Sequence, residues 1–293
     1  MTSIVPNRPD VELGPTGRVI GFVRGRPAAV AAGVFVLLLV VAAVFASQLA
    51  PYDPYTQDLL DRLQPPSGEH WLGTDDYGRD VLSRLIFGVR ISLAASLQAV
   101  ATALVIGLPL GVIAGYRGGW VDTVSTRVMD ALMSAPALVL AITIVAVLGS
   151  GVTNAMLAVG LVMAPRFYRV ARASTMDVRG DTYIEASVAL GCTTSRTIGR
   201  HILPNVMPPI VLVVSVSLGT AVAAEASLSF LGLGAKAPAA SWGSMLSTAA
   251  SNMQLAPYLV WPPGVMIFLT VLAFTYLGDG VRRALTRSRN GSN

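Results

Sequence analysis

Long uncharged runs alternate with short charged segments along this chain, and this pattern predicts its secondary structure. The runs occupy positions 27–52, 91–116, 131–165, 201–224 and 237–278. About 20 predominantly apolar residues in a helix cross a hydrocarbon core of roughly 30 Å. Every run is long enough for one such helix, so the pattern predicts an all-α protein that crosses a membrane several times.

Two of the runs divide further. The third run is interrupted at Gly149-Ser150-Gly151, which predicts one helix on each side of a tight turn. In the fifth run, positions 237–254 are rich in Ser, Ala, Asn and Pro, so the membrane span is expected after them. The sequence therefore predicts six transmembrane helices, at about 28–49, 90–114, 131–148, 153–173, 205–228 and 257–278.

The composition agrees with a membrane protein. Of the 293 residues, 53% are hydrophobic and 13% are charged, against roughly 25% charged in soluble domains. The formal net charge of +5 needs no nucleic acid partner to explain it. The first apolar run exceeds the 7–15 residues of a typical signal-peptide core, and about 26 residues precede it, so a retained anchor is favoured over a cleaved signal.

The basic residues predict the orientation, because short cytoplasmic loops are enriched in Lys and Arg. With the N-terminus inside, 16 of the 21 Lys and Arg residues are cytoplasmic. The external five are Arg62, Arg79, Arg84, Arg90 and Lys236. Both termini are then cytoplasmic. The predicted organisation is a cytoplasmic N-terminal segment (1–27), a first transmembrane helix (28–49), an external loop (50–89), a five-helix core (90–278) with a cytoplasmic loop at 174–204, and a basic cytoplasmic tail (279–293).

Several kinds of chemistry are excluded or disfavoured. Lys236 is the only lysine, and Gly-Ala precedes it and Ala follows it, so no phosphate-binding loop ending in Gly-Lys-Ser/Thr exists. One cysteine, Cys192, and two distant histidines make a Cys/His metal site improbable. No aspartate pair for intramembrane proteolysis lies inside the predicted spans. We therefore expect no catalytic, cofactor-binding or metal site in this chain.

The predicted spans are almost free of ionisable groups, which argues against a proton-coupled carrier. Glu225 is the exception. It follows the cytoplasmic Pro204-Asn205 by about 20 residues, and so falls near the outer end of its helix. A pairing or capping role is favoured over a proton relay.

The polar segment 179–205 lies between two apolar runs. Its Thr182-Tyr183-Ile184-Glu185 sequence fits a capping box at the start of a helix. Gly191 is costly inside a helix, and predicts a turn or a close approach. A second short helix is expected to start at Thr194 or Ser195 and to stop before Pro204. The segment thus predicts a stiff helix-turn-helix joined to transmembrane helices.

This segment resembles the coupling loop of the inner-membrane permease subunits of ATP-binding-cassette importers, which carries Glu-Ala-Ala, a Gly four residues later and Leu-Pro about twelve residues after that. Here Ser187 replaces the second Ala of that motif. The resemblance implies a type I importer permease fold, with ATP and Mg bound by separate ATPase subunits. It also implies that the residues contacting the ATPase are Glu185, Ala186, Ser187, Gly191, Leu203 and Pro204.

A second stretch, His70 to Leu93, is similar to the C-type permeases of dipeptide, oligopeptide and nickel importers. Gly73 and Gly78 bracket a polar turn, and Asp80 is placed to pair with Arg84 one helical turn later. The segment is expected to cap the second span, to receive a substrate-binding protein, or both. Its candidate residues are Gly73, Thr74, Asp75, Gly78, Arg79, Asp80 and Arg84.

Two further features concern the apolar core. Residues 226–234 and 241–246 are also similar to peptide and nickel permeases, with Trp242 and Trp261 expected at the membrane interface. Gly107, Gly111 and Gly115 recur at every fourth position, a small-residue face on which another helix can pack closely. Packing inside the subunit is favoured over contact between subunits.

Taken together, the resemblance implies a non-enzymatic permease of a bacterial inner membrane that takes up dipeptides or oligopeptides. The implied partners are a homologous B-type permease, one or two ATPase subunits, an extracytoplasmic peptide-binding protein and membrane lipids. The alternatives are import of nickel or another small solute, an ATP-independent carrier or channel, and a membrane peptidase.

Overall fold

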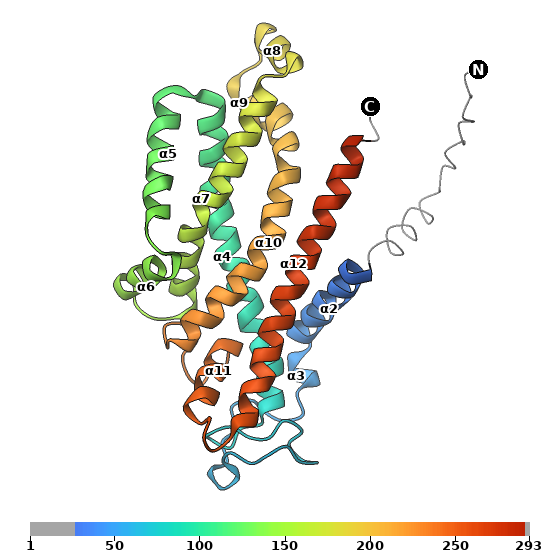
Figure 1. The fold of residues 1–293 in the computed structure, drawn as a ribbon, viewed down its shortest axis with the longest axis vertical. Coiled ribbons are helices and arrows are strands. Elements are labelled where there is room, and N and C mark those ends of the chain that lie inside the picture. Colours follow the sequence, from blue (N-terminus) through green and yellow to red (C-terminus); the bar gives the residue numbers. More distant parts are fainter. Residues whose placement is uncertain (1–26, 291–293) are drawn as a thin grey trace, which may run out of the picture.

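The chain folds into a bundle of long helices that run side by side along one axis (Figure 1). The computed structural model describes residues 27–290, and the helices are the only regular elements in that range. The predicted cytoplasmic segment before residue 27 and the last residues of the basic tail, 291–293, lie outside the described residues. The long helices are α2 (Pro27–Val44), α4 (Val81–Arg117), α7 (Val152–Arg179), α10 (Leu203–Phe230) and α12 (Trp261–Asn290).

Shorter elements connect the long helices. Among them, η2 is a π-helical turn, whereas η1 and η3 are 3₁₀ turns. The short elements are α3 (Ala46–Leu49), η1 (Leu59–Asp61), α5 (Gly119–Ser134), α6 (Ala137–Leu148), α8 (Thr182–Ala189), α9 (Thr194–Thr197), η2 (Ile198–Ile202), α11 (Trp242–Ser251) and η3 (Pro257–Val260).

Within residues 27–290, four helices are long and apolar enough to cross a membrane: Pro27–Val44, Val81–Arg117, Thr194–Phe230 and Pro257–Arg283. The pair α5 and α6 adds a fifth span if the two bent helices act as one. By contrast, α7 is less apolar because Arg166, Arg169 and Arg172 lie within it. These arginines correct the expectation that the predicted spans are almost free of ionisable groups.

The predicted helix near 131–148 is instead two helices, bent by 96°. Pro136 has no N–H to donate, and its ring disfavours helical backbone at the residue before it. Ala135 accordingly has φ −92° and ψ 147°, an extended conformation. The proline therefore ends α5 and starts α6 in a new direction.

The helix that contains the predicted span 90–114 starts earlier, at Val81, and is 37 residues long. Asp80 caps it, since its carboxylate accepts a hydrogen bond from the backbone N–H of Ser83 at 2.7 Å. The uncharged run does not place this start, because Arg84 and Arg90 lie inside the helix. Charged side chains are thus part of the first turns of α4.

Helices α4 and α7 are in backbone contact through glycine. A Cβ atom on Gly111 would lie 2.5 Å from the carbonyl oxygen of Tyr168, and one on Gly107 would lie 2.5 Å from that of Ala164. A Cβ on Gly115 would likewise lie 2.7 Å from the carbonyl oxygen of Arg172. The three glycines therefore lie against α7 within the subunit, and no larger residue fits there without movement.

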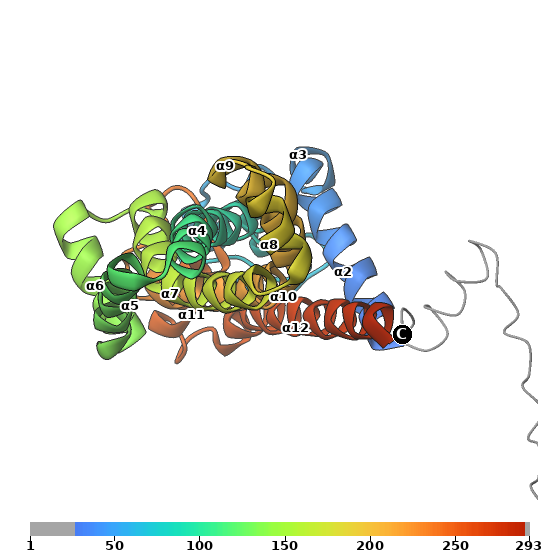
Figure 2. The same ribbon diagram turned by 90° about the horizontal axis from the view of Figure 1, so that it is seen from above.

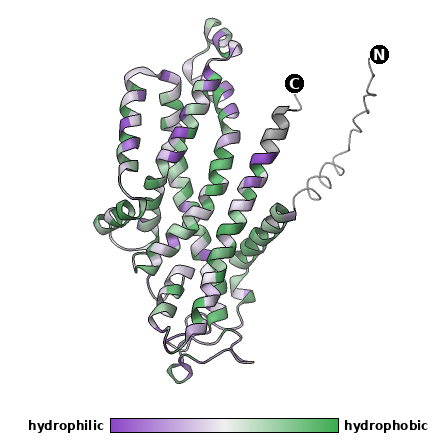
Figure 3. Cartoon of the chain, viewed as in Figure 1, coloured by the Kyte–Doolittle hydropathy of each residue, from purple (hydrophilic) through white to green (hydrophobic). Residues whose placement is uncertain are grey.

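The remaining helices surround this central pair. Seen along the bundle axis, α5 and α6 lie on one side of α4 and α7, while α12 and α2 lie on the other (Figure 2). Hydrophilic residues concentrate toward the end that carries α8, on α5, α7, α8 and the part of α12 just before its grey end (Figure 3). The bundle thus has one end marked by α8 and another marked by α11 and the loop before α4 (Figure 1).

Candidate functional site

The segment between α7 and α10 projects from one end of the bundle as two short helices (Figure 1). Its first helix, α8, begins at Thr182, so Asp181 and not Thr182 occupies the capping position. The Asp181 carbonyl accepts from the backbone N–H of Ile184 at 2.9 Å and of Glu185 at 3.3 Å. The cap therefore lies one residue earlier in the chain than the expected capping box, and Glu185 lies in the first turn of the helix.

The end of α8 explains Gly191. This glycine has φ +83°, a left-handed conformation that other residues adopt only with strain. The N–H of Cys192 donates to the carbonyl of Ser187 at 3.1 Å, which is the six-residue closure of a Schellman motif. Gly191 thus terminates α8 at a turn, one of the two roles expected from the sequence.

The second helix does not stop before Pro204. Thr193 caps α9 by accepting from the N–H of Arg196, and the chain then passes through the π turn η2 directly into α10. Pro204 is the second residue of α10 and directly follows the π turn. The predicted stop is wrong, because α9, η2 and α10 form one long apolar helix of 37 residues, Thr194–Phe230.

Burial divides this segment into two faces. On the inner face, Ile184 is 2% exposed and packs in one cluster with Ile202 and Val206. On the outer face, Glu185, Ala186, Gly191 and Pro204 are exposed. Ser187 is buried and Leu203 is half-buried, so these two candidate residues support the segment from within.

A polar contact joins α8 to the start of α10. The side-chain amide of Asn205 donates to the Tyr183 hydroxyl at 3.1 Å and to the His201 carbonyl at 2.7 Å. The Tyr183 and His201 rings meet edge to face at 6.3 Å. Since Ile184 also packs against α10 residues, α8 is fixed to α10 by both apolar and polar contacts.

At the opposite end, a charged cluster organises the loop before α4. The Asp75 carboxylate lies 2.7 Å from Nε of Arg79 and 3.2 Å from Nε of Arg84, and all three side chains are buried. Arg84 also donates to the carbonyl of Pro54 at 3.0 Å. One buried carboxylate thus ties a loop residue and a helix residue together.

Asp80 is bonded differently from the expectation. Its carboxylate lies 2.9 Å from Nδ1 of His70 and accepts from the Ser83 hydroxyl at 2.7 Å. The predicted pairing of Asp80 with Arg84 is therefore wrong, because Asp80 is occupied as the helix cap and Arg84 reaches Asp75.

All seven candidate residues of the segment from His70 to Leu93 are buried. Gly73 and Gly78 have φ +76° and +71°, and a Cβ on either would collide with loop backbone. Trp71, 71% exposed, and Tyr77, 46% exposed, are among the exposed side chains of this loop. The seven residues hold the loop in shape, and a partner would meet their exposed neighbours.

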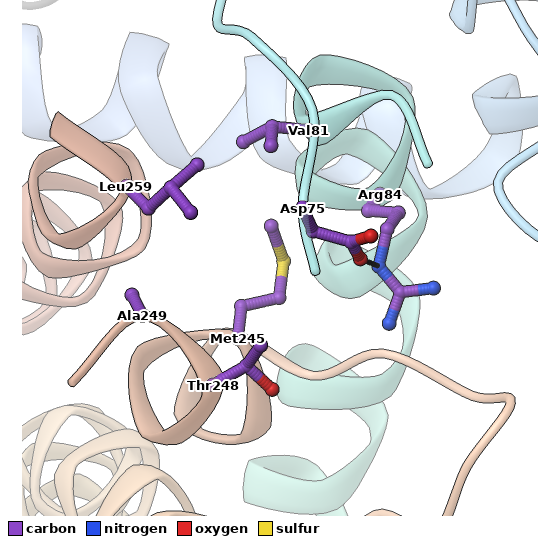
Figure 4. A pocket seen from close by; sticks show the side chains of 7 residues that line it. All are labelled: Asp75, Val81, Arg84, Met245, Thr248, Ala249 and Leu259. Carbon is purple, nitrogen blue, oxygen red and sulfur yellow. Dashed lines mark ion pairs between the residues drawn. The ribbon is translucent and has the colours of Figure 1, made fainter. Parts of the chain in front are cut away.

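A small pocket lies beside this cluster, with room for about one water molecule. Asp75 and Arg84 form one side of it, and Met245, Thr248 and Ala249 of α11 form another (Figure 4). The loop and α11 therefore form one packed unit at this end.

Desolvation, together with the neighbouring Asp75 charge, raises the pKa of Asp76 above its ordinary value.

Trp242 lies at the centre of that unit and is 0% exposed, so its expected place at the membrane interface is wrong. Its indole N–H donates to the Leu85 carbonyl at 3.1 Å, and its backbone N–H donates to the Ser92 hydroxyl at 3.3 Å. Trp261, in contrast, is 73% exposed. Gly88 on α4 leaves room for this side chain, since a Cβ there would lie 3.1 Å from the indole.

A bundle of several helices long and apolar enough to cross a membrane, with a two-helix projection at one end, has the form of a multi-pass membrane protein. Comparison with known proteins agrees. Residues 107–291 match the family model of the binding-protein-dependent transport system inner membrane component. Residues 22–66 match the N-terminal TM domain of oligopeptide transport permease C.

Curated relatives narrow the class. The chain is 46% identical over 258 residues to the glutathione transport system permease protein GsiD of Pectobacterium atrosepticum, covering 88% of this chain and 86% of the relative. It is 42% identical over 252 residues to the dipeptide transport system permease protein DppC of Alkalihalophilus pseudofirmus, covering 86% and 83%. The chain belongs to the inner-membrane permease family of ABC importers, in its peptide class. It is a multi-pass membrane subunit and not an enzyme.

Solved structures support the same fold. The inward-facing MetNI methionine ABC transporter contains a chain that aligns with a TM-score of 0.56 at 23% identity, covering 68% of this chain and 95% of that one. An amino acid ABC transporter aligns with a TM-score of 0.51 at 18% identity, covering 69% and 94%. At these identities the likeness extends to the type I permease fold alone.

Proposed function

We propose that this chain is one half of the translocation pathway of an importer for short peptides. The observation that carries the proposal is the two-faced coupling segment, because its inner face is fixed to α10 and its outer face is free for a partner. An ATPase subunit that contacts Glu185, Ala186, Gly191 and Pro204 moves α8 and α10 as one body. ATP and Mg stay with the ATPase subunits.

We propose that the chain crosses the membrane six times. In chain order these are α2, α4, the bent pair α5 and α6, α7, α10 and α12. The end that carries α8 is cytoplasmic in this arrangement, since Arg179, Arg196 and Arg200 lie there and basic residues favour that side. Both chain termini then lie in the cytoplasm, in a bacterial inner membrane.

Two further partners complete the assembly. A homologous B-type permease encloses the pathway together with this chain, and an extracytoplasmic binding protein delivers the peptide to the outer end. The exposed Trp71 and Tyr77 are the side chains that we assign to contact with that protein, because the candidate loop residues themselves are buried. Aromatic residues of this kind are enriched in protein interfaces.

Short peptides are the favoured cargo, as relatives are named for glutathione and dipeptide transport. The test is to co-purify the chain with its permease, ATPase and receptor partners and to reconstitute them in vesicles. Dipeptides, tripeptides, glutathione and longer peptides are expected to stimulate ATP hydrolysis and to accumulate inside. Stimulation by Ni²⁺ alone would overturn the peptide assignment, and uptake without the ATPase subunits would overturn the importer assignment.

A further inference from the structure

Glu225 is a carboxylate buried inside the apolar bundle. It is 1% exposed and lies toward the outer end of α10, six residues before Leu231. A buried carboxylate is costly unless hydrogen bonds or a cation compensate it. The sequence favours a pairing or capping role for this residue over a proton relay, and its hydrogen bonds show which partners it has.

Both oxygens of Glu225 accept hydrogen bonds from serine hydroxyls. Oε1 accepts from Ser229 of the same helix at 2.7 Å, and Oε2 accepts from Ser92 of α4 at 3.2 Å. Ser92 in turn accepts from the backbone N–H of Trp242, the first residue of α11. A chain of buried hydrogen bonds therefore runs from α10 through α4 to α11.

The backbones around this chain approach closely. A Cβ on Gly243 of α11 would lie 2.5 Å from the Ala226 carbonyl of α10, and one on Gly234 would lie 1.9 Å from the Ser229 hydroxyl. Ser229 also accepts from the N–H of Ala235, in the connection from α10 to α11. This close backbone approach restricts the movement of α11 as long as Glu225 holds the hydroxyls of Ser92 and Ser229 in place.

We propose that Glu225 is a positioning residue for peptide transport, which keeps α11 seated against α4 and α10 at the outer end of the pathway. This inference rests on the proposed function. The role needs a hydrogen-bonding group of the right shape and not a charge. Glutamine supplies it, because its carbonyl accepts from one serine and its amide N–H donates to the oxygen of the other.

The test uses the reconstituted complex with its receptor and compares Glu225→Gln with Glu225→Ala. Glu225→Gln is expected to keep peptide uptake and ATP hydrolysis within about threefold of the wild type. Glu225→Ala is expected to lower peptide uptake at least about tenfold, because two buried hydroxyls lose their acceptor. ATP hydrolysis should fall much less, and hydrogen exchange of the α11 amides should become faster.

Ser92→Ala provides an independent variant in case Glu225→Ala does not assemble. It removes the link from Glu225 to Trp242 but leaves the carboxylate bonded to Ser229, so it should also reduce uptake and speed α11 exchange. Ser96→Ala is the matched control. Ser96 is a buried serine one turn further along α4, and its hydroxyl bonds only to the Leu93 carbonyl of its own helix.

The outcomes separate the two proposals. Absence of peptide uptake by the wild-type complex refutes the proposed function itself. If the wild type imports peptide but Glu225→Gln is as inactive as Glu225→Ala, the charge is required and the positioning role is wrong. The role is equally wrong if Ser92→Ala behaves like Ser96→Ala in both uptake and α11 exchange.

Discussion

The guanidinium Nε of Arg84 lies 3.2 Å from Oδ2 of Asp75, so a residue of the first turns of α4 is bonded to the loop that precedes the helix. Both side chains are buried, and Arg79 approaches the same carboxylate oxygen at 2.7 Å. Asp75 is therefore the shared anion of two arginines. This arrangement makes the loop and the helix interdependent in stability.

Replacing Arg84 with Gln should destabilise the protein. Removing one member of a buried ion pair costs about 3–5 kcal/mol, and the lower end applies because Arg79 still pairs with Asp75. The measurement is the free energy of unfolding in detergent micelles. Arg62→Gln is the control, since Arg62 is exposed and should change stability little. Equal stability of the two variants would contradict the structural role of the Asp75 cluster.

Asp76→Asn should stabilise the outer loop at neutral pH. The pKa of Asp76 is raised mainly by desolvation, so the folded state binds its proton more tightly than the unfolded state does. Its contribution to stability is therefore greatest at low pH and is lost as pH rises through the raised pKa. Thermal unfolding should show a higher midpoint for Asp76→Asn than for the wild type at pH 7, and the difference should shrink as pH falls toward the ordinary Asp pKa of about 3.9. A difference that grows on acidification would refute this.

Gly111→Ala should weaken the packing of α4 on α7. Its new methyl group would lie 2.5 Å from the Tyr168 carbonyl oxygen and 2.8 Å from the Ala171 Cβ, so the helices must separate. Overpacking of this kind costs about 1–3 kcal/mol. Gly264→Ala in α12 is the matched control, because nothing lies within 4 Å of its added Cβ. Gly264→Ala should be neutral or slightly stabilising, and unfolding midpoints of both variants are the measurement.

Ala186→Leu tests the coupling surface without disturbing the fold. Ala186 is exposed on α8, and Leu has nearly the same helix propensity as Ala. If an ATPase subunit packs on this face, the larger side chain should lower peptide uptake by about tenfold or more, by analogy with overpacked interiors. Ala173→Leu, at an exposed position of α7, is the matched control, and Arg283→Ala should also transport normally. Unchanged uptake by Ala186→Leu would place the ATPase contact elsewhere.

Gly191 requires a pair of variants, because its backbone is left-handed. Gly191→Leu strains the turn that ends α8, so a loss of uptake could reflect the turn and not the docking. Gly191→Asn tolerates this conformation better. We expect Asn to preserve more uptake than Leu, measured at equal amounts of assembled complex. Equal loss by both would indicate that the space beside Gly191, and not its conformation, matters to the partner.

The long helices were predictable from the sequence, because runs without charge are a direct requirement of the hydrocarbon core. The start of α4 was not, since Asp80 caps it and the Asp75 cluster buries arginines that were expected to be in water. The bend after α5 had a local signal in Ala135-Pro136, which the hydropathy pattern alone hides. The continuity of α9 with α10 had none, because a proline in the first turn of a helix looks the same in sequence as one that follows a helix.

The site residues also include some that a local sequence signal predicted and some that only the folded structure reveals. The role of Glu185, Ala186 and Ser187 stays a prediction, whereas the turn at Gly191, predicted from the cost of glycine in a helix, is confirmed by its left-handed backbone. The hydrogen bonds of Glu225 depend on Ser92, which is far from it in sequence, and on the glycines that let α11 approach. Such contacts arise from tertiary packing, which a single sequence does not reveal.

The unbroken passage from α9 through the π turn into α10 has a mechanical consequence. The helix Thr194–Phe230 has 37 residues, which at 1.5 Å per residue gives a length of about 55 Å. A tilt of about 5° around one end of such a helix displaces the other end by about 5 Å. That displacement exceeds the 3.2 Å that separates Ser92 from Glu225, so a small tilt of this helix at its α8 end suffices to break a hydrogen bond at the opposite end of the bundle.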